Sequence, residues 1–134
     1  MKAQERDRGA SAVEFAIVAP ILVLMLLGIL AFGHAFHVQS VLSNAARDGV
    51  RVMALQDTSS GADPQTEARQ TAITSAAPSA SVAADQITIT PATCEAASTV
   101  GPGTATVTIS YPMQLLGGFG SVTLTGKGTM RCNG

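Results

Sequence analysis

A run of apolar residues near the N-terminus constrains the fold of this chain more than any other feature. From Phe15 to Phe36 the sequence is FAIVAPILVLMLLGILAFGHAF, in which His34 is the only strongly polar residue. A helix of this length spans about 33 Å, close to the ~30 Å hydrocarbon thickness of a bilayer. A soluble core helix would instead carry polar residues at every third or fourth position. The run therefore predicts one transmembrane helix, kinked at Pro20 because proline removes a helix hydrogen bond.

The residues around this span favour one orientation. Three basic residues precede Gly9, and by the positive-inside rule they favour a cytoplasmic N-terminus, although two arginines also follow the span. A competing interpretation is a secretory signal peptide cut after Ala35, but the apolar stretch exceeds the roughly 7–15 residues of a signal-peptide core. We expect three parts: a cytoplasmic leader over 1–9, a transmembrane helix over 10–36 and an extracytoplasmic domain over 37–134.

Glu14 lies at the border of the apolar run and needs an explanation. A carboxylate costs on the order of 2–3 kcal/mol near the centre of a bilayer, so it is rarely placed in a membrane helix without a partner. Glu14 lies five residues after Gly9. If the chain were cut after Gly9, the new amine of Ala10 would be a cation. Glu14 of one subunit could then neutralise the amine of a neighbour inside a helix bundle.

Two sequence blocks resemble a known family. Arg8 to Ala16, followed by Pro20 and a leucine-rich span, looks like a prepilin peptidase site with glutamate as the fifth mature residue. It resembles more closely the TadE-like (TadE/TadG) pseudopilins of tight-adherence (Tad, or Flp) pilus systems. A second block after the span is similar to the family's AAR-x-G-x-R pattern, through Ala45, Ala46, Arg47, Gly49 and Arg51.

The resemblance implies a minor pilin or pseudopilin that acts in assembling a Tad pilus. It implies processing after Gly9 by a prepilin peptidase, with the single-pass chain in the cytoplasmic membrane. Its partners would be other pilus subunits, the inner-membrane assembly platform, the peptidase and membrane lipid. Both incorporation into the fibre and retention in the envelope are compatible with it. The alternative function is a membrane-anchored extracytoplasmic binding module unrelated to pili, with an uncut leader and no role for Glu14.

The residues after the span predict an α+β domain. Residues 38–55 continue as an amphipathic helix, and a second short helix runs from about Pro64 to Ala76, with Asp63 as its N-cap. Residues 86–90, 104–111 and 121–130 alternate apolar or small residues with Thr and Ser, which predicts three antiparallel strands with one buried face. The apolar stripe expected to cover that face comprises Val38, Val41, Leu42, Ala45, Gly49, Val52 and Met53.

Cysteine content and charge complete the sequence-based expectations. Cys94 and Cys132 allow one pairing, and in an exported domain they are expected to form a disulfide. The net charge of −1 gives no reason to expect nucleic-acid binding. His34 and His37 have no acidic or thiol residue nearby in sequence to complete a metal site, and no histidine follows His37 to serve as a base. We therefore expect no enzymatic activity, no cofactor and no metal.

Overall fold

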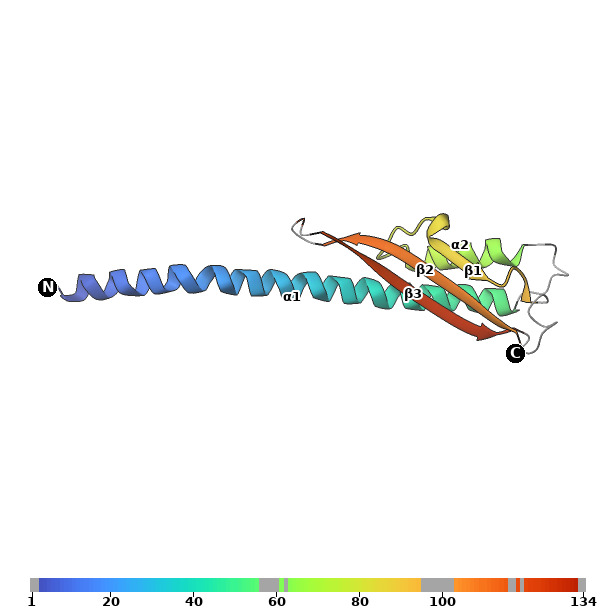
Figure 1. The fold of residues 1–134 in the computed structure, drawn as a ribbon, viewed down its shortest axis with the longest axis horizontal. Coiled ribbons are helices and arrows are strands. Elements are labelled where there is room, and N and C mark those ends of the chain that lie inside the picture. Colours follow the sequence, from blue (N-terminus) through green and yellow to red (C-terminus); the bar gives the residue numbers. More distant parts are fainter. Residues whose placement is uncertain are drawn as a thin grey trace. The chain divides into compact units, whose positions relative to one another are not determined.

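The computed structural model describes residues 3–55, 61, 63–94, 103–115, 118 and 120–132, with side chains from Gly9 onward. Its elements are shown in Figure 1: α1 (Ala3–Leu55), α2 (Pro64–Ala76), a short 3₁₀ helix η2 (Ala84–Gln86), β1 (Ile87–Thr90), β2 (Thr104–Gln114) and β3 (Ser121–Arg131). The chain divides into two units, Met1–His34 and Ala35–Gly134. The expected α+β class, with a long helix, a short helix and three strands, is confirmed.

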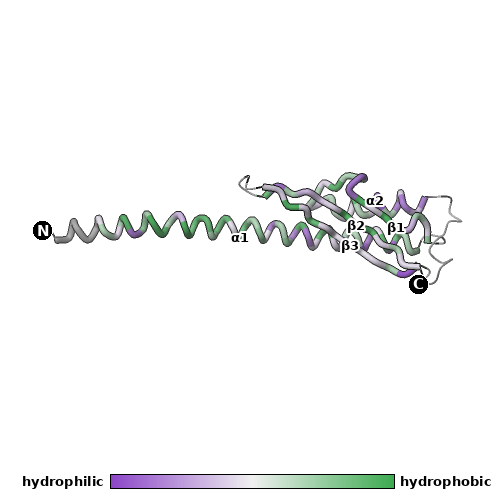
Figure 2. Tube along the Cα trace, viewed as in Figure 1, coloured by the Kyte–Doolittle hydropathy of each residue, from purple (hydrophilic) through white to green (hydrophobic). Residues whose placement is uncertain are grey.

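The N-terminal unit is formed by the first part of α1. By length and composition, α1 contains one stretch able to cross a membrane, and the most apolar window of that stretch is 0% buried. Hydrophobic residues dominate this part of the helix in Figure 2. Pro20 lies inside α1, and a kink there stays a prediction.

The C-terminal unit contains a three-stranded sheet in the order β1-β2-β3. Both strand pairs are antiparallel, with Ile87 opposite Ile109 and Val107 opposite Gly128. Inward and outward residues alternate along β1 and through most of β2, as the sequence predicted. One face of the sheet is therefore directed toward the helices.

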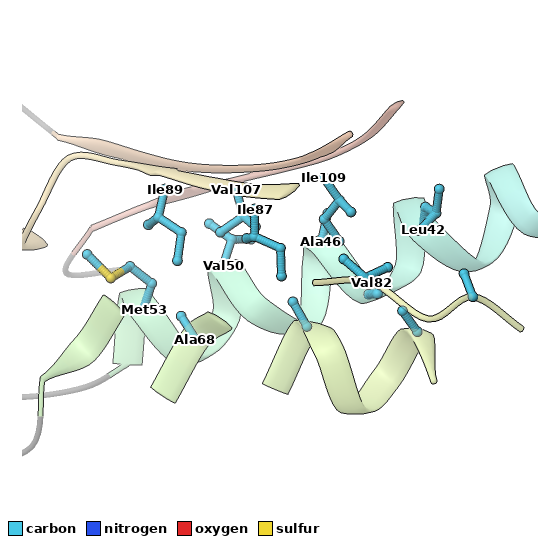
Figure 3. Close-up of a cluster of buried hydrophobic side chains, with 14 of the residues drawn as sticks. Leu42, Ala46, Val50, Met53, Ala68, Val82, Ile87, Ile89, Val107 and Ile109 are labelled. Atoms are coloured by element: carbon cyan, nitrogen blue, oxygen red, sulfur yellow. The ribbon is translucent and has the colours of Figure 1, made fainter. Parts of the chain in front are cut away.

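The core lies between the sheet, α2 and the part of α1 after Ala35. Figure 3 shows Ile89, Val107 and Ile109 directed from the sheet toward the helices. The most extensively buried large side chains are Leu42, Met53, Ile109, Val38, Val50 and Val107. The expected stripe on α1 is partly wrong: Ala46 and Val50 are buried, whereas Val41 and Val52 are only half-buried. Because β3 and α2 approach α1 from different directions, the buried surface of the helix is rotated and widened relative to a single stripe.

The start of α2 confirms the expected cap. Asp63 has extended backbone angles, and its carboxylate accepts hydrogen bonds from the Thr66 backbone N–H at 3.2 Å and the Thr66 hydroxyl at 2.6 Å. Pro64 follows in the first turn, where its missing N–H has no cost. The Thr66 side-chain hydrogen bond is the main cause that lowers the pKa of Asp63.

The two ends of β3 differ from expectation. The strand pattern assigned Val122 and Met130 to the buried face, but they are 37% and 40% exposed. The residues of β3 that contact α1 closely are Gly126 and Gly128, in the middle of the strand. A twisted strand stays in contact with a helix over only a short stretch, so the helix covers the inward-facing side chains near its ends less completely.

The expected disulfide joins Cys94 to Cys132, with 5.3 Å between the Cα atoms. Cys132 is buried, and its backbone N–H donates to the Gly103 carbonyl at 2.8 Å. The bond therefore fixes the residue after β3 to the chain beyond β1, across a sequence separation of 38 residues.

Removing this cross-link is expected to destabilise the C-terminal unit. For Cys94→Ser/Cys132→Ser we expect a loss of about 3 kcal/mol, because the bond restricts the unfolded chain and the core it supports is small. Urea unfolding of the full chain in detergent, followed by circular dichroism, measures the loss. Wild-type protein in reductant is the control and should match the variant. An unfolding midpoint equal to that of the oxidised wild type would contradict the prediction.

Candidate functional site

The first group of candidate residues lies near the N-terminal end of α1. Gly9, Ala10 and Glu14 are all helical and exposed. Ala10 and Glu14 are four residues apart, so they share one face of the helix. Among the residues that the structure describes, the Glu14 carboxylate has no hydrogen-bond or ion-pair partner. An amine created at Ala10 and the carboxylate of Glu14 would both be available to a neighbouring helix.

The surface that follows Glu14 is almost entirely apolar. Phe15 is 71% exposed and Phe36 is 73% exposed, and the large apolar side chains between them are also exposed. An apolar surface of this extent is not stable in water, so it requires lipid or other helices around it. Glu14 is therefore the carboxylate at the edge of a surface that must leave water.

The second group contains small residues whose role is packing. Ala45 and Ala46 are fully buried, and Gly49 is buried with them. A Cβ atom on Gly49 would lie 2.9 Å from the Ala68 carbonyl oxygen and 3.2 Å from the Ala72 Cβ. The small side chains of this block therefore allow α2 to lie directly against α1.

The two arginines of the same block have a different environment. Arg47 and Arg51 are exposed, although the backbone of α1 at Arg47 lies against β3. Neither guanidinium has a hydrogen-bond or ion-pair partner in the described part of the chain. The block thus combines a packing surface with two cations that remain free to meet other molecules.

Gly49→Ala is expected to destabilise the domain although alanine is the better helix former. The helix gains about 1 kcal/mol in intrinsic propensity, but the added methyl meets the Ala68 carbonyl and forces α2 away. We expect a net loss of about 1–2 kcal/mol. The check is urea unfolding of the full chain, with Asn44→Ala as a control at an exposed position of α1. Stabilisation by Gly49→Ala would show that α2 does not pack closely at this point.

Both groups lie on one continuous segment of α1, and that segment can be compared with known proteins. Residues 9–51 match the TadE-like protein family. The match begins at the predicted cleavage glycine and ends at the second arginine of the later block, which confirms the resemblance seen in the sequence. The TadE-like match supports involvement in a Tad pilus system. The sheet and α2 lie outside it. Comparisons with curated proteins and with solved structures found no match.

The sequence predicted that the buried face of the last strand packs on α1, but not how closely the two backbones approach. Gly126 and Gly128 lie against the backbone of α1 at Leu42 and Ala46. The Gln39 side-chain amide donates to the Thr125 carbonyl at 2.6 Å and ties α1 to the middle of β3. Two glycines at alternate positions of a strand were the available signal, because strand glycines often mark a close backbone approach.

The histidines at the end of the apolar run do not form a metal site with the described residues. His37 Nε2 lies 3.2 Å from the Ser79 hydroxyl, which links α1 to the chain after α2. Within the described ranges, no group of three or more His, Cys, Asp or Glu side chains could hold a metal ion. The role that this geometry supports for His37 is a hydrogen bond between elements of the domain.

Proposed function

We propose that this TadE-like chain is a minor pilin or pseudopilin that acts in the assembly of a Tad pilus. A prepilin peptidase cuts after Gly9, and the mature chain begins at Ala10. It crosses the cytoplasmic membrane once, with its N-terminus inside and its disulfide-bonded domain outside. It works with other pilus subunits and the inner-membrane assembly platform. The chain has no catalytic role of its own and uses no cofactor.

The observation that carries this proposal is the placement of Glu14. Its carboxylate is exposed and, within the described residues, unpartnered, at the start of an apolar helical surface and one turn from Ala10. A lone carboxylate there is unfavourable in lipid, whereas a carboxylate paired with a neighbour's new amine is stabilised. Cleavage would therefore create the partner that makes entry of the helix into a bundle favourable.

This pairing would also position the subunits along the helix axis. The carboxylate and the amine lie four residues apart on one face, so a neighbour that brings its amine to Glu14 is displaced by a defined amount. The exposed apolar residues after Glu14 then pack against the neighbouring helices or stay in lipid. The folded domain from Ala35 onward is carried outside by the same helix, where the Cys94–Cys132 bond is stable.

Intact-mass measurement of the membrane protein tests the proposal. The chain is isolated from cells with and without the prepilin peptidase, and Gly9→Leu serves as a variant expected to resist cleavage. We expect a mature chain beginning at Ala10 only when both the peptidase and Gly9 are present. A chain that begins at Met1 under all conditions would favour the membrane-anchored binding module. A chain that begins at Phe36 would indicate a cleaved signal peptide.

A further inference from the structure

The outer edge of β3 is open. β2 and β3 pair one to one from Thr104 opposite Arg131 to Gln114 opposite Ser121, with no bulge between. Just beyond each end of β3, Cys132 N–H donates to the Gly103 carbonyl and Leu115 N–H donates to the Gly120 carbonyl. In an antiparallel ladder, alternate residues direct both backbone polar groups to the same side. The even-numbered residues of β3 therefore face β2, and the odd-numbered residues from 121 to 131 face the open edge.

One side-chain hydrogen bond gives independent evidence that the odd-numbered residues of β3 face away from β2. The Thr125 carbonyl, on an odd-numbered residue, accepts from Gln39 Nε2 at 2.6 Å rather than from β2. No other backbone N–H or C=O of the odd-numbered β3 residues has a partner in the described part of the chain. Apart from the Thr125 carbonyl, the edge thus presents unpaired donors and acceptors on the odd-numbered residues of this 11-residue strand.

The two edges of the sheet differ. β1, at the opposite edge, has 4 residues and is followed at once by Pro91, which has no N–H to offer. β3 is 11 residues long and contains neither proline nor a bulge. Folded proteins usually protect a long edge, because it is a template for another strand. The open edge of β3 therefore has the properties of a docking site for an extended polypeptide segment.

Charge indicates what that segment carries. β1, β2 and β3 contain no aspartate or glutamate, whereas Lys127 and Arg131 are exposed on odd-numbered positions of β3. The basic side chains along the edge favour an acidic segment. Two copies of β3 would bring like charges together, and no described strand of this chain supplies a carboxylate.

We propose that the open edge of β3 binds an extended, acidic segment of a different protein chain by adding it to the sheet. Backbone hydrogen bonds from the odd-numbered residues hold the segment, and Lys127 and Arg131 pair with its carboxylates. The identification of the other protein as a pilus subunit rests on the proposed function. The binding of an acidic segment at this edge does not depend on it.

Proline at an odd-numbered position gives a specific test. Thr129 is exposed and its N–H faces the open edge, so Thr129→Pro removes a docking donor without removing a β2–β3 hydrogen bond. Thr129→Val keeps the N–H and is the matched control. A photoreactive amino acid at position 125 reports the neighbour of the edge in cells that produce the full chain. The same group at Thr88, exposed on the opposite edge strand, is the control for position.

We expect an adduct from position 125, and not from position 88, that mass spectrometry maps to one acidic segment of another protein. Thr129→Pro should reduce the yield of this adduct about tenfold, because it removes a hydrogen bond and changes the local backbone. Thr129→Val should leave the yield unchanged. Disulfide formation confirms that each variant folds. An absent adduct, an adduct to a second copy, or one unaffected by proline would each overturn the inference. An uncleaved chain that still forms the adduct would contradict the proposed function and leave this inference standing.

Discussion

Gly126→Val is expected to cost the folded domain about 4 kcal/mol or more, enough to prevent stable folding. A Cβ at this position would collide with the carbonyl oxygen of Leu42 and lie 2.5 Å from its carbonyl carbon. Both are backbone atoms of a helix, so neither can rotate away. Valine is the better strand former, so intrinsic propensity predicts the opposite sign. Urea unfolding of the full chain in detergent, followed by circular dichroism, measures the effect.

The control for this prediction is another valine substitution on the same strand. Thr129 is exposed, and Thr129→Val should change stability by no more than about 0.5 kcal/mol. If Gly126→Val unfolded at the same urea concentration as Thr129→Val, β3 could not lie directly on α1. The helices and the sheet would then have to enclose a differently arranged core.

Glu14→Gln is expected to lower incorporation of the chain into pilus assemblies by roughly tenfold to a hundredfold. Loss of a charge-assisted hydrogen bond in lipid costs about 1.5–3 kcal/mol, and 1.4 kcal/mol corresponds to a factor of ten. The side chain keeps its size, so the membrane helix itself should be unaffected. The measurement is the fraction of the chain recovered in assembled complexes rather than free in the membrane, at equal expression.

Glu67→Gln is the matched control, because it removes the same charge from an exposed position of α2. It should assemble as the wild type does. Glu14→Asp keeps the charge and should recover part of the incorporation that glutamine loses. Equal incorporation of Glu14→Gln and Glu67→Gln would remove the physical basis of the pilin proposal.

Much of the fold could be predicted because the local signals are strong and agree. The second helix has an N-cap, a proline in its first turn and a matching length, and the structure places it at Pro64–Ala76 as expected. The strands followed from alternation of apolar residues with threonine, and the disulfide from two cysteines in a domain expected to be exported. These features depend on neighbours in sequence or on a single possible pairing.

The parts that could not be predicted depend on contacts between distant residues. The burial of Ala46 and Val50 follows from two elements that approach α1 from different directions, which a single apolar stripe does not reveal. The exposure of Val122 and Met130 follows from how far β3 stays in contact with the helix. The open edge of β3 became visible only once the register with β2 and the Gln39 hydrogen bond were known.

The candidate site also has a part that the sequence predicted and a part that required tertiary contacts. Gly9, Ala10 and Glu14 could be proposed from spacing, and the structure adds that they are exposed and helical. The block from Ala45 to Arg51 could be found by resemblance, but its division into buried small residues and outward arginines required the packing of α2 and β3. Sequence resemblance identifies such a block, whereas tertiary contacts assign a role to each residue in it.

The most direct test of the central claim is a zero-length cross-link between Glu14 and the N-terminal amine of a neighbouring subunit. Membranes that contain the assembled apparatus are treated with a carbodiimide, which joins a carboxylate to an amine only when the two are in contact. Peptide mass spectrometry then identifies the joined residues. We expect an amide between Glu14 of this chain and the first mature residue of a neighbour, present only when the peptidase is active. Finding Glu14 modified by solvent nucleophiles alone, in assemblies that form normally, would contradict it.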